Sequence, residues 1–388
     1  MIFSRDRILV THVGSLPRSE ALSEMLIDRE EGKPFSEQQL ADEMDHAVRH
    51  VITKQAEAGI DIGNDGEQQR VGFQTYVPRR MSGFAGESKR RRGRDFEEFP
   101  ALLDDLMRRF PKRSRMQNAP EAQSEIHYLD SSAITLEIDR YQRAAKDSGA
   151  FAESFMTAPS PGIISTTMLN AYYDSQQSYL AALAREMRNE YLAIHRSGLL
   201  LQIDAPDLAM DRCMFYRDHS DRDFVKAAEM HVAALNQAID GIPRDQVRLH
   251  CCWGNWNGPH MYDVALDLIL PVLYQANVGA LSIEFGNPRH QHEFEALHRH
   301  KLPDHMLLLP GVIESNSNIV EHPEVVARRL EEAVAVVGER IIASADCGFG
   351  TFTNREYVIE PVVWLKLKAL RRGADIASTR LWGRGAAQ

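Results

Sequence analysis

The chain has 388 residues, which is enough for one large domain or two ordinary ones. Its hydrophobic content of 44% and charged content of 26% are typical of a globular protein, and the net charge of -10 argues against nucleic-acid binding. The four cysteines are too few for a disulfide scaffold, the start lacks a signal peptide, and no apolar run reaches the roughly 18 residues of a membrane span. We therefore expect a cytoplasmic protein with no membrane partner.

Strands and helices alternate along the chain. The amphipathic helix at about residues 175–197 is the strongest signal, because its apolar side chains recur every three or four residues. The expected strands lie at residues 8–10, 59–62, 154–156, 199–203, 246–249, 280–283, 306–309 and 341–346. The other expected helices lie at about residues 36–58, 221–240, 261–275 and 323–337.

Residues 83–134 interrupt this order. They are polar, basic and poorly periodic, and we interpret them as an insertion with short helices of its own. The basic run at residues 89–94 lies within it. We interpret this run as a solvated loop, with a specific anion site as the alternative.

Repeated strand-then-helix order predicts a parallel α/β fold, and the number of units fits a (β/α)₈ TIM barrel formed by the whole chain, residues 1–388. An open doubly wound sheet is the second choice, but the chain lacks a glycine-rich dinucleotide fingerprint. Polar residues follow the expected strands, where a barrel has its active site. They are Ser15, Asp65, Glu67, Asp204, His250, Cys252, Glu284, Glu314 and Cys347.

A metal site is predicted at the end of the strand at residues 246–249. His250 and Cys252 are two positions apart, so an extended backbone points both toward one side, as zinc requires. Glu284 and Cys347 end two other strands and would complete a four-coordinate zinc site. A carboxylate is a more exchangeable ligand than a third thiolate, which favours a zinc ion that activates a substrate. Cys251 alternates to the opposite side and is expected in the core.

These motifs together resemble the catalytic domain of cobalamin-independent methionine synthase. The matching pieces, in the family's order, are Val13-Gly14-Ser15, Gly66-Glu67, Gln202-Ile203-Asp204, His250-Cys251-Cys252, Ser282-Ile283-Glu284 and Asp346-Cys347. The resemblance implies a (β/α)₈ barrel in which His250, Cys252, Glu284 and Cys347 bind zinc. It also implies that Ser15, Glu67 and Asp204 bind an amino-acid thiol.

Two departures from the family pattern bear on the reaction. The family's Asp-Glu-Pro is Asp204-Ala205-Pro206 here, and the position of the family's catalytic histidine is Asn316. Asparagine does not donate a proton near neutral pH, so a different acid or a different alkyl donor is expected. The segments around Cys252 and Asn287 resemble a short-chain branch that includes epoxyalkane:coenzyme M transferases.

The expected function is therefore zinc-dependent alkyl or methyl transfer to homocysteine or a similar small thiol. Opening of an epoxide by coenzyme M is the alternative, and a non-catalytic zinc protein is the alternative of another class. His12, His260, His290 and His292 are candidate proton donors. The expected partners are a small thiol and an alkyl donor, and the sequence carries no signal for an oligomeric state.

Overall fold

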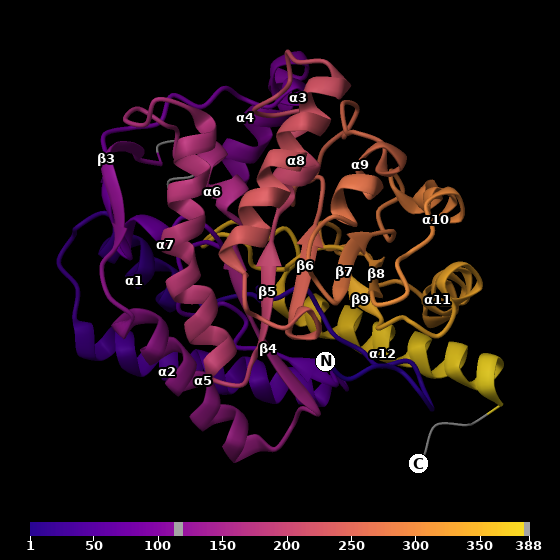
Figure 1. Cartoon of the computed structure of the whole chain (residues 1–388). Helices are drawn as coiled ribbons and strands as arrows, with labels where there is room; N and C mark the ends of the chain where they lie inside the picture. Colours follow the sequence, from indigo (N-terminus) through magenta and orange to yellow (C-terminus); the bar gives the residue numbers. More distant parts are fainter. Residues whose placement is uncertain (112–118, 384–388) are drawn as a thin grey trace.

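In the computed structural model, residues 1–111 and 119–383 are described. A parallel sheet with the order β1-β4-β5-β6-β7-β8-β9 curls into a barrel (Figure 1). The N-terminal segment closes it, because Thr11 pairs with Ile62 and Val10 pairs with Ala343, both in parallel. The strands are β1 (Ile62–Gly63), β4 (Glu153–Pro159), β5 (Leu200–Asp204), β6 (Val247–Cys251), β7 (Ala280–Glu284), β8 (Leu307–Ile313) and β9 (Ser344–Ala345). The closed barrel is the predicted fold, and the open sheet is excluded.

A ring of helices surrounds the barrel. In the described part of the chain each of its helices packs against the next, and the last contacts the first. In ring order they are α2 (Glu37–Glu57), α5 (Ser132–Ser148), α7 (Gln176–Arg196), α8 (Asp221–Ala238), α9 (Leu266–Leu273), α10 (Phe294–Arg299), α11 (Pro323–Val337) and α12 (Glu360–Trp382). Serine side chains cap several N-termini: Ser36 accepts from Gln39 N, and Ser175 accepts from Ser178 N.

Smaller elements complete the chain. The helices α1 (Glu20–Glu30) and α6 (Pro161–Thr167) lie outside this ring, and 3₁₀ turns cover Val77–Arg79, Pro206–Leu208, Met210–Arg212, Arg244–Gln246 and Gln291–Glu293. Among the described residues, no helix combines the length and apolar character that a membrane span requires.

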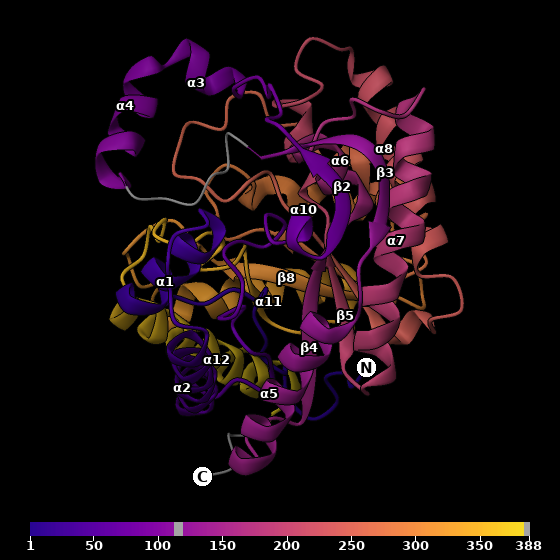
Figure 2. The same ribbon diagram turned by 90° about the vertical axis from the view of Figure 1, so that its left-hand side faces the viewer.

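The insertion contains an antiparallel hairpin and two helices. The hairpin strands are β2 (Met81–Ala85) and β3 (Glu121–Tyr128), and the helices between them are α3 (Arg94–Glu98) and α4 (Pro100–Arg109). Figure 2 shows the hairpin against α7, and Figure 1 shows α3 and α4 at the end of the barrel toward which β5 and β6 point. The short helices were predicted, but the hairpin was not. Residues 132–134 belong to α5, so the insertion ends earlier than expected.

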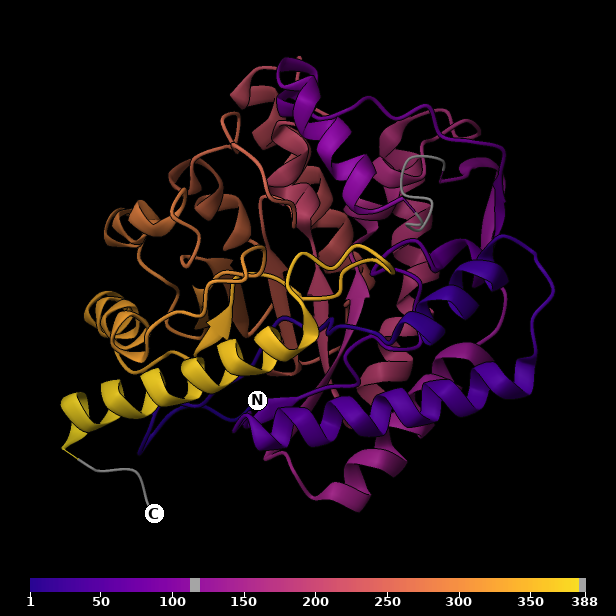
Figure 3. The ribbon, with the colours of Figure 1, turned by 180° about the vertical axis from the view of Figure 1, so that it is seen from behind.

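Most other predicted elements are present, but the strand expected at residues 8–10 is reduced to an isolated bridge at Val10. The helix expected from residue 261 begins only at Leu266. The long C-terminal helix α12 was not predicted; Figure 3 shows it in yellow, on the same side of the barrel as α2. Lys366, Gly373 and Ser378 lie on the buried face of α12 and interrupt its apolar pattern.

The barrel interior is layered along the strands. At the N-terminal ends an apolar layer contains Ile62, Phe155, Leu200, Leu309 and Ile342. Side chains one position away on β5, β6 and β7 face the helices and join the main core. They include Leu201, Ile203, Leu249, Cys251, Leu281 and Ile283. The core position predicted for Cys251 is thereby confirmed.

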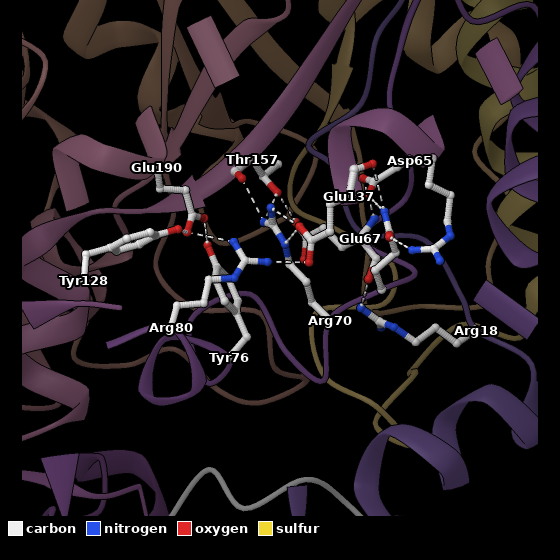
Figure 4. A network of polar contacts seen from close by, with 12 residues as sticks. Arg18, Asp65, Glu67, Arg70, Tyr76, Arg80, Tyr128, Glu137, Thr157 and Glu190 are labelled. Atoms are coloured by element: carbon white, nitrogen blue, oxygen red, sulfur yellow. Dashed lines mark hydrogen bonds and ion pairs between the residues drawn. The ribbon is translucent and has the colours of Figure 1, made fainter. Parts of the chain in front are cut away.

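A buried ionic network ties the hairpin, two ring helices and β4 together (Figure 4). Arg80 pairs with Glu137 of α5 and, at 2.7 Å, with Glu190 of α7. Arg70 pairs with Glu137 at 3.0 Å and donates to the Thr157 carbonyl of β4 at 2.8 Å. Burial alone would raise the pKa of Glu137, but Arg70 and Arg80 lower it to about 2. The charged form of Glu137 therefore stabilises the fold.

We expect the variant Glu137→Gln to unfold with a free energy lower by about 3 kcal/mol at pH 7, because two buried guanidinium groups lose their shared carboxylate. The depressed pKa gives the sign of the pH dependence. The contribution of Glu137 is complete above its unfolded-state pKa of about 4.5 and is lost as the pH falls toward about 2. Urea unfolding at pH 7 and pH 3.5 measures both effects.

Glu125→Gln is the matched control, since Glu125 lies on β3 with an exposed side chain. Its unfolding free energy should stay within about 0.5 kcal/mol of wild type. Equal stability of Glu137→Gln and wild type at pH 7 would contradict this account of the network.

Candidate active site

Three side chains converge at the C-terminal end of the barrel strands. His250 lies on β6, Cys252 is the first residue after β6, and Cys347 lies just after the end of β9. One ligand atom of each lies within 4.8 Å of the other two, and all three residues are buried. The strand alternation predicted from the sequence therefore brings the imidazole and two thiols together.

The geometry of this group suits a zinc ion. The Cys252 and Cys347 sulfurs are 4.0 Å apart, too far for a disulfide, and two sulfurs on one tetrahedral zinc lie about 3.8 Å apart. Apart from the neighbouring Cys252 sulfur, the buried ring nitrogens of His250 have no hydrogen-bond partner. A buried imidazole nitrogen without a partner is costly, and a metal ion would satisfy it.

The electrostatics of the group favour a thiolate. The Cys347 thiol donates to Cys252, and with His250 it holds the pKa of Cys252 well below its usual range. The same interaction raises the pKa of Cys347. Cys252 raises the pKa of His250, although burial opposes the shift. Since thiolates bind metals and thiols do not, this group is prepared to accept a cation.

Glu284 lies at the end of β7, beside this group but outside it. It is buried, and burial raises the pKa of its carboxyl well above the usual range, with Cys252 as the next cause. The loop after it is fixed by Asp346, which accepts from Phe285 N at 3.1 Å and from Gly286 N at 2.8 Å. A bound cation would favour the charged form of Glu284, and this carboxylate could then act as a fourth ligand.

The three-residue group opens onto a cavity of about 450 Å³. All three predicted substrate residues line the same cavity: Ser15, Glu67 and Asp204. A cavity of this size accommodates a small organic molecule. His250, Cys252 and Cys347 therefore share one cavity with the three substrate candidates, whereas Glu284 is not among its lining residues.

Glu67 is held in a strained position. Its φ of 55° lies in the left-handed region, which is unfavourable for a residue with a long side chain. Thr157 donates to Oε1 at 2.9 Å, and the Thr157 hydroxyl in turn accepts from Arg70 at 3.1 Å (Figure 4). Oε2 is buried without a partner. Burial raises the pKa of Glu67, and Arg70 and Arg18 oppose the shift. A cationic ligand would satisfy the free oxygen.

Asp204 and Ser15 lie on other walls of the cavity. Asp204 accepts from Gln202 at 2.7 Å, and burial raises its pKa to about 8. Ser15 contacts the loop that carries Cys347, and its carbonyl accepts from Phe349 N at 2.8 Å. A Cβ on Gly348 would lie 2.0 Å from Ser15 Oγ, so a glycine is required for this approach.

Sequence reasoning missed the outer walls. Aromatic and aliphatic side chains from distant segments line them: Phe73, Phe96, Leu103, Leu106, Met210, Met214, Trp256 and Phe352. The basic run at Lys89, Arg90, Arg91 and Arg92 also lines the cavity. Three of these four side chains are exposed, but the run faces the site instead of forming an unrelated surface loop. The concentration of basic residues in this run was the sequence feature that could have indicated its place at the site.

Asn316 is buried after β8 but is not among the residues that line the cavity. His250 is the only histidine among the lining residues of this cavity in the described structure. His12 does not line the cavity; its ring is hydrogen-bonded to Gln55 at 2.8 Å, and burial lowers its pKa to about 4. The four histidines considered as proton donors therefore lie away from the cavity.

Two of them form a separate cluster behind Trp253. Asp263 Oδ2 lies 2.8 Å from His260 Nδ1 and 2.9 Å from His290 Nε2. The other His260 nitrogen donates to the Trp256 carbonyl at 3.0 Å, and the His290 ring stacks on Trp253 at 3.8 Å. Three of the four ring nitrogens have partners, and His290 Nδ1 is buried without a hydrogen bond. Through these bonds the cluster supports the loop after β6.

Comparisons with known proteins agree with this architecture. The chain is 23% identical over 379 residues to a methionine synthase of Sulfurisphaera tokodaii, covering 97% of this chain and 94% of the relative. It is 28% identical over 177 residues to a 2-hydroxypropyl-CoM lyase of Xanthobacter autotrophicus, covering 39% and 45%. The solved B12-independent methionine synthase of Shewanella sp. W3-18-1 matches with a TM-score of 0.70 at 20% identity, covering 97% of this chain and 100% of that one.

The family described as "Cobalamin-independent synthase, Catalytic domain" matches residues 8–127 and 126–363, which is most of the chain. The resemblance inferred from the motifs is confirmed, and this chain belongs to the cobalamin-independent synthase catalytic-domain family.

Proposed function

We propose that residues 1–388 form a zinc-dependent transferase that moves a methyl or alkyl group onto a small thiol. The observation that carries the proposal is the position of His250, Cys252 and Cys347, which meet within 4.8 Å and open onto the cavity. Membership of the methionine-synthase family supports transfer to a thiol. Cavity access argues against the non-catalytic alternative, because structural zinc sites are closed.

His250, Cys252 and Cys347 would hold the zinc, with Glu284 as the exchangeable fourth ligand. When bound, zinc would lower the pKa of a substrate thiol so that it is a nucleophile near neutral pH. Asp346 positions the loop after Glu284 through its bonds to Phe285 N and Gly286 N.

We propose that Glu67, Asp204 and Ser15 hold the thiol substrate. An amino-acid thiol such as homocysteine carries an ammonium group, which suits the unpartnered Oε2 of Glu67. Arg70 acts through Thr157 to fix Oε1, and Oε2 is left without a partner. Ser15 contributes a hydroxyl beside Gly348, the residue after Cys347.

Two reactions are considered, and they differ in the alkyl donor. In methyl transfer the sulfur forms a bond to the methyl carbon, the carbon–nitrogen bond breaks, and the leaving amine takes a proton. In epoxide opening the sulfur attacks a ring carbon, the carbon–oxygen bond breaks, and the oxygen takes a proton. Two observations support the second reaction as the alternative. One is the similarity to a 2-hydroxypropyl-CoM lyase, and the other is Asn316, which cannot supply the proton that the leaving amine of the first reaction needs.

The first test concerns the metal. We expect about one zinc per wild-type chain, and strong zinc loss in Cys252→Ser and in Cys347→Ser, because each removes a thiolate ligand. Elemental analysis measures zinc, and circular dichroism checks the fold. Cys251→Ala is the matched control, since Cys251 faces the core. Full zinc content in both serine variants would refute the ligand assignment.

The second test concerns Glu284. We expect Glu284→Gln to keep more zinc than either cysteine variant but to bind the thiol with altered affinity, because a carboxylate exchanges more readily than a thiolate. Cobalt substitution makes the site visible by absorption spectroscopy. Identical spectral changes on adding homocysteine to wild type and Glu284→Gln would remove Glu284 from the exchange.

The third test concerns the donor. Asparagine at position 316 supplies no proton to a leaving amine, and general acid catalysis typically contributes about 10²–10⁴-fold. We therefore expect weak or absent methyl transfer from methylfolate, and faster reaction with a strained epoxide. Thiol consumption with each donor measures the difference. Asn316→His is the informative variant, and robust methylfolate activity of the wild type would restore the methionine-synthase reaction in full.

A further inference from the structure

A second group of metal-ligating side chains lies outside the cavity. His260 and Asp263 lie in the segment between β6 and α9, and His290 lies just before the 3₁₀ turn Gln291–Glu293 that follows β7. One ring nitrogen of each histidine and one carboxylate oxygen of Asp263 all lie within 4.8 Å of one another. The three side chains are at most 4% exposed. None of the three lines the cavity with the candidate zinc ligands, so the group is a separate one.

The inner atoms of this group converge on one point. His260 Nδ1 lies 2.8 Å from Asp263 Oδ2, and His290 Nε2 lies 2.9 Å from the same oxygen. Asp263 Oδ1 is also buried, and it has no hydrogen-bond partner among the described residues. Two imidazoles and one carboxylate are a donor set that Zn²⁺ and its neighbours among the divalent transition metals bind.

The outer nitrogen of each histidine faces an acceptor. His260 Nε2 donates to the Trp256 carbonyl at 3.0 Å, and His290 Nδ1 lies 3.6 Å from Glu293 Oε1. Glu293 is itself held in place, because its Oε2 accepts from Leu266 N at 2.9 Å. A histidine that binds a metal through one nitrogen characteristically directs its other N–H at a carbonyl or a carboxylate. Both histidines therefore have the outer surroundings of metal ligands.

The outer acceptors also decide where the protons lie. A neutral imidazole carries one N–H, and because the Trp256 carbonyl only accepts, a neutral His260 carries its proton on Nε2. Its Nδ1 then directs a lone pair at the Asp263 carboxylate, which is repulsive. The group therefore requires either a buried imidazolium or a cation between these two atoms. A divalent ion satisfies the Nδ1 lone pair and Asp263 Oδ1 together, whereas an imidazolium leaves Oδ1 without a partner.

The backbone and a neighbouring ring hold the ligands in place. The His290 ring stacks on Trp253, with the centroids 3.8 Å apart and an angle of 13° between the planes. The His260 carbonyl accepts from Arg289 Nε at 3.0 Å, which joins the segments after β6 and β7 beside the ligands. His260 itself has a φ of 53°, in the sparsely populated left-handed region. Ligands that are fixed before binding lose little freedom when an ion enters.

We propose that His260 Nδ1, Asp263 and His290 Nε2 form a second metal site, which binds a divalent transition-metal ion, with Zn²⁺ as the probe. Asp263 Oδ1 is available as a fourth donor atom. The site is closed from the cavity, as structural metal sites are, so the ion takes no part in the reaction. It joins the segment after β6, which carries Cys252 and Trp256, to the segment after β7.

This ion is additional to the zinc of the proposed active site. Soft thiolates select zinc, so His250 with two cysteines retains zinc more tightly than two imidazoles and one carboxylate do. The desalted chain is therefore expected to keep one zinc at the thiolate site. The second ion is measured by adding Zn²⁺ to that chain.

Isothermal titration of the desalted full chain with Zn²⁺ should show one further equivalent per wild-type chain. Asp263→Asn, which keeps the size of the side chain, and His290→Gln should each weaken this binding more than about 100-fold, because loss of an outer partner alone costs about 10–100-fold. Glu293→Gln changes such an outer partner and should fall within that lower range. Circular dichroism checks the fold of each variant.

Asp267→Asn is the matched control, because Asp267 is an exposed aspartate of the neighbouring helix α9 and pairs with Arg299. It should bind the second equivalent as wild type does. A wild-type chain that takes up no further zinc would overturn the proposal, and so would wild-type affinity in Asp263→Asn. Either result would identify the group as an imidazolium–carboxylate pair.

Cys252→Ser separates the two metal sites. This variant should lose the zinc of the desalted chain and still bind one equivalent of added zinc, whereas Cys252→Ser combined with Asp263→Asn should not. Added Zn²⁺ should also raise the midpoint of thermal unfolding of Cys252→Ser, because an ion that binds the folded state stabilises it. The double variant should show no such rise. Refutation of the thiolate site would leave this result intact.

Discussion

The active site depends on the alternation of side chains along parallel strands that close into a barrel. On β6, Arg248 and His250 face the interior, and Cys252 continues that series just beyond the strand; Leu249 and Cys251 face the helices. Closure through Thr11 and Ile62 then brings the ends of distant strands to one rim. A shift of one residue in register would exchange the ligand face for the core face and destroy the site.

Charged side chains below the site are held mainly by bonds within the barrel. Arg248 donates to the His12 carbonyl at 2.8 Å and lies over the Phe155 ring at 4.0 Å. The network of Arg70 and Glu137 likewise satisfies its own charges and fixes Thr157. Buried atoms without partners occur in several parts of the barrel interior, including Arg248 Nε and Gln202 Oε1, but those of Glu67 and His250 lie on residues that line the cavity. On cavity-lining residues such atoms are available to a ligand.

Local patterns predicted the barrel, most ring helices and the rim residues because each depends on short-range periodicity. The pairing of His250 with Cys252 needed only an extended backbone. Glu67 is different: its orientation depends on Thr157, 90 positions away, and on a strained backbone that no local pattern indicates. Helix α12 was missed for a related reason, since its polar residue Lys366 is buried with a long-range partner, the Glu321 carboxylate. The hairpin β2–β3 was missed because few side chains of β3 are buried and they give no regular apolar pattern.

The insertion shows how a common barrel acquires its own specificity. The metal candidates and Glu67 come from strand ends and loops of the barrel, where the chemistry is positioned with little freedom. The basic run and the apolar side chains Phe96, Leu103 and Leu106 come from the segment between β2 and β3, which is anchored to the barrel by a few backbone bonds. Substitutions in this segment can change the charge and shape of the outer cavity without moving the zinc candidates. In the proposed function, the reaction and the choice of substrate would therefore depend on separate parts of the chain.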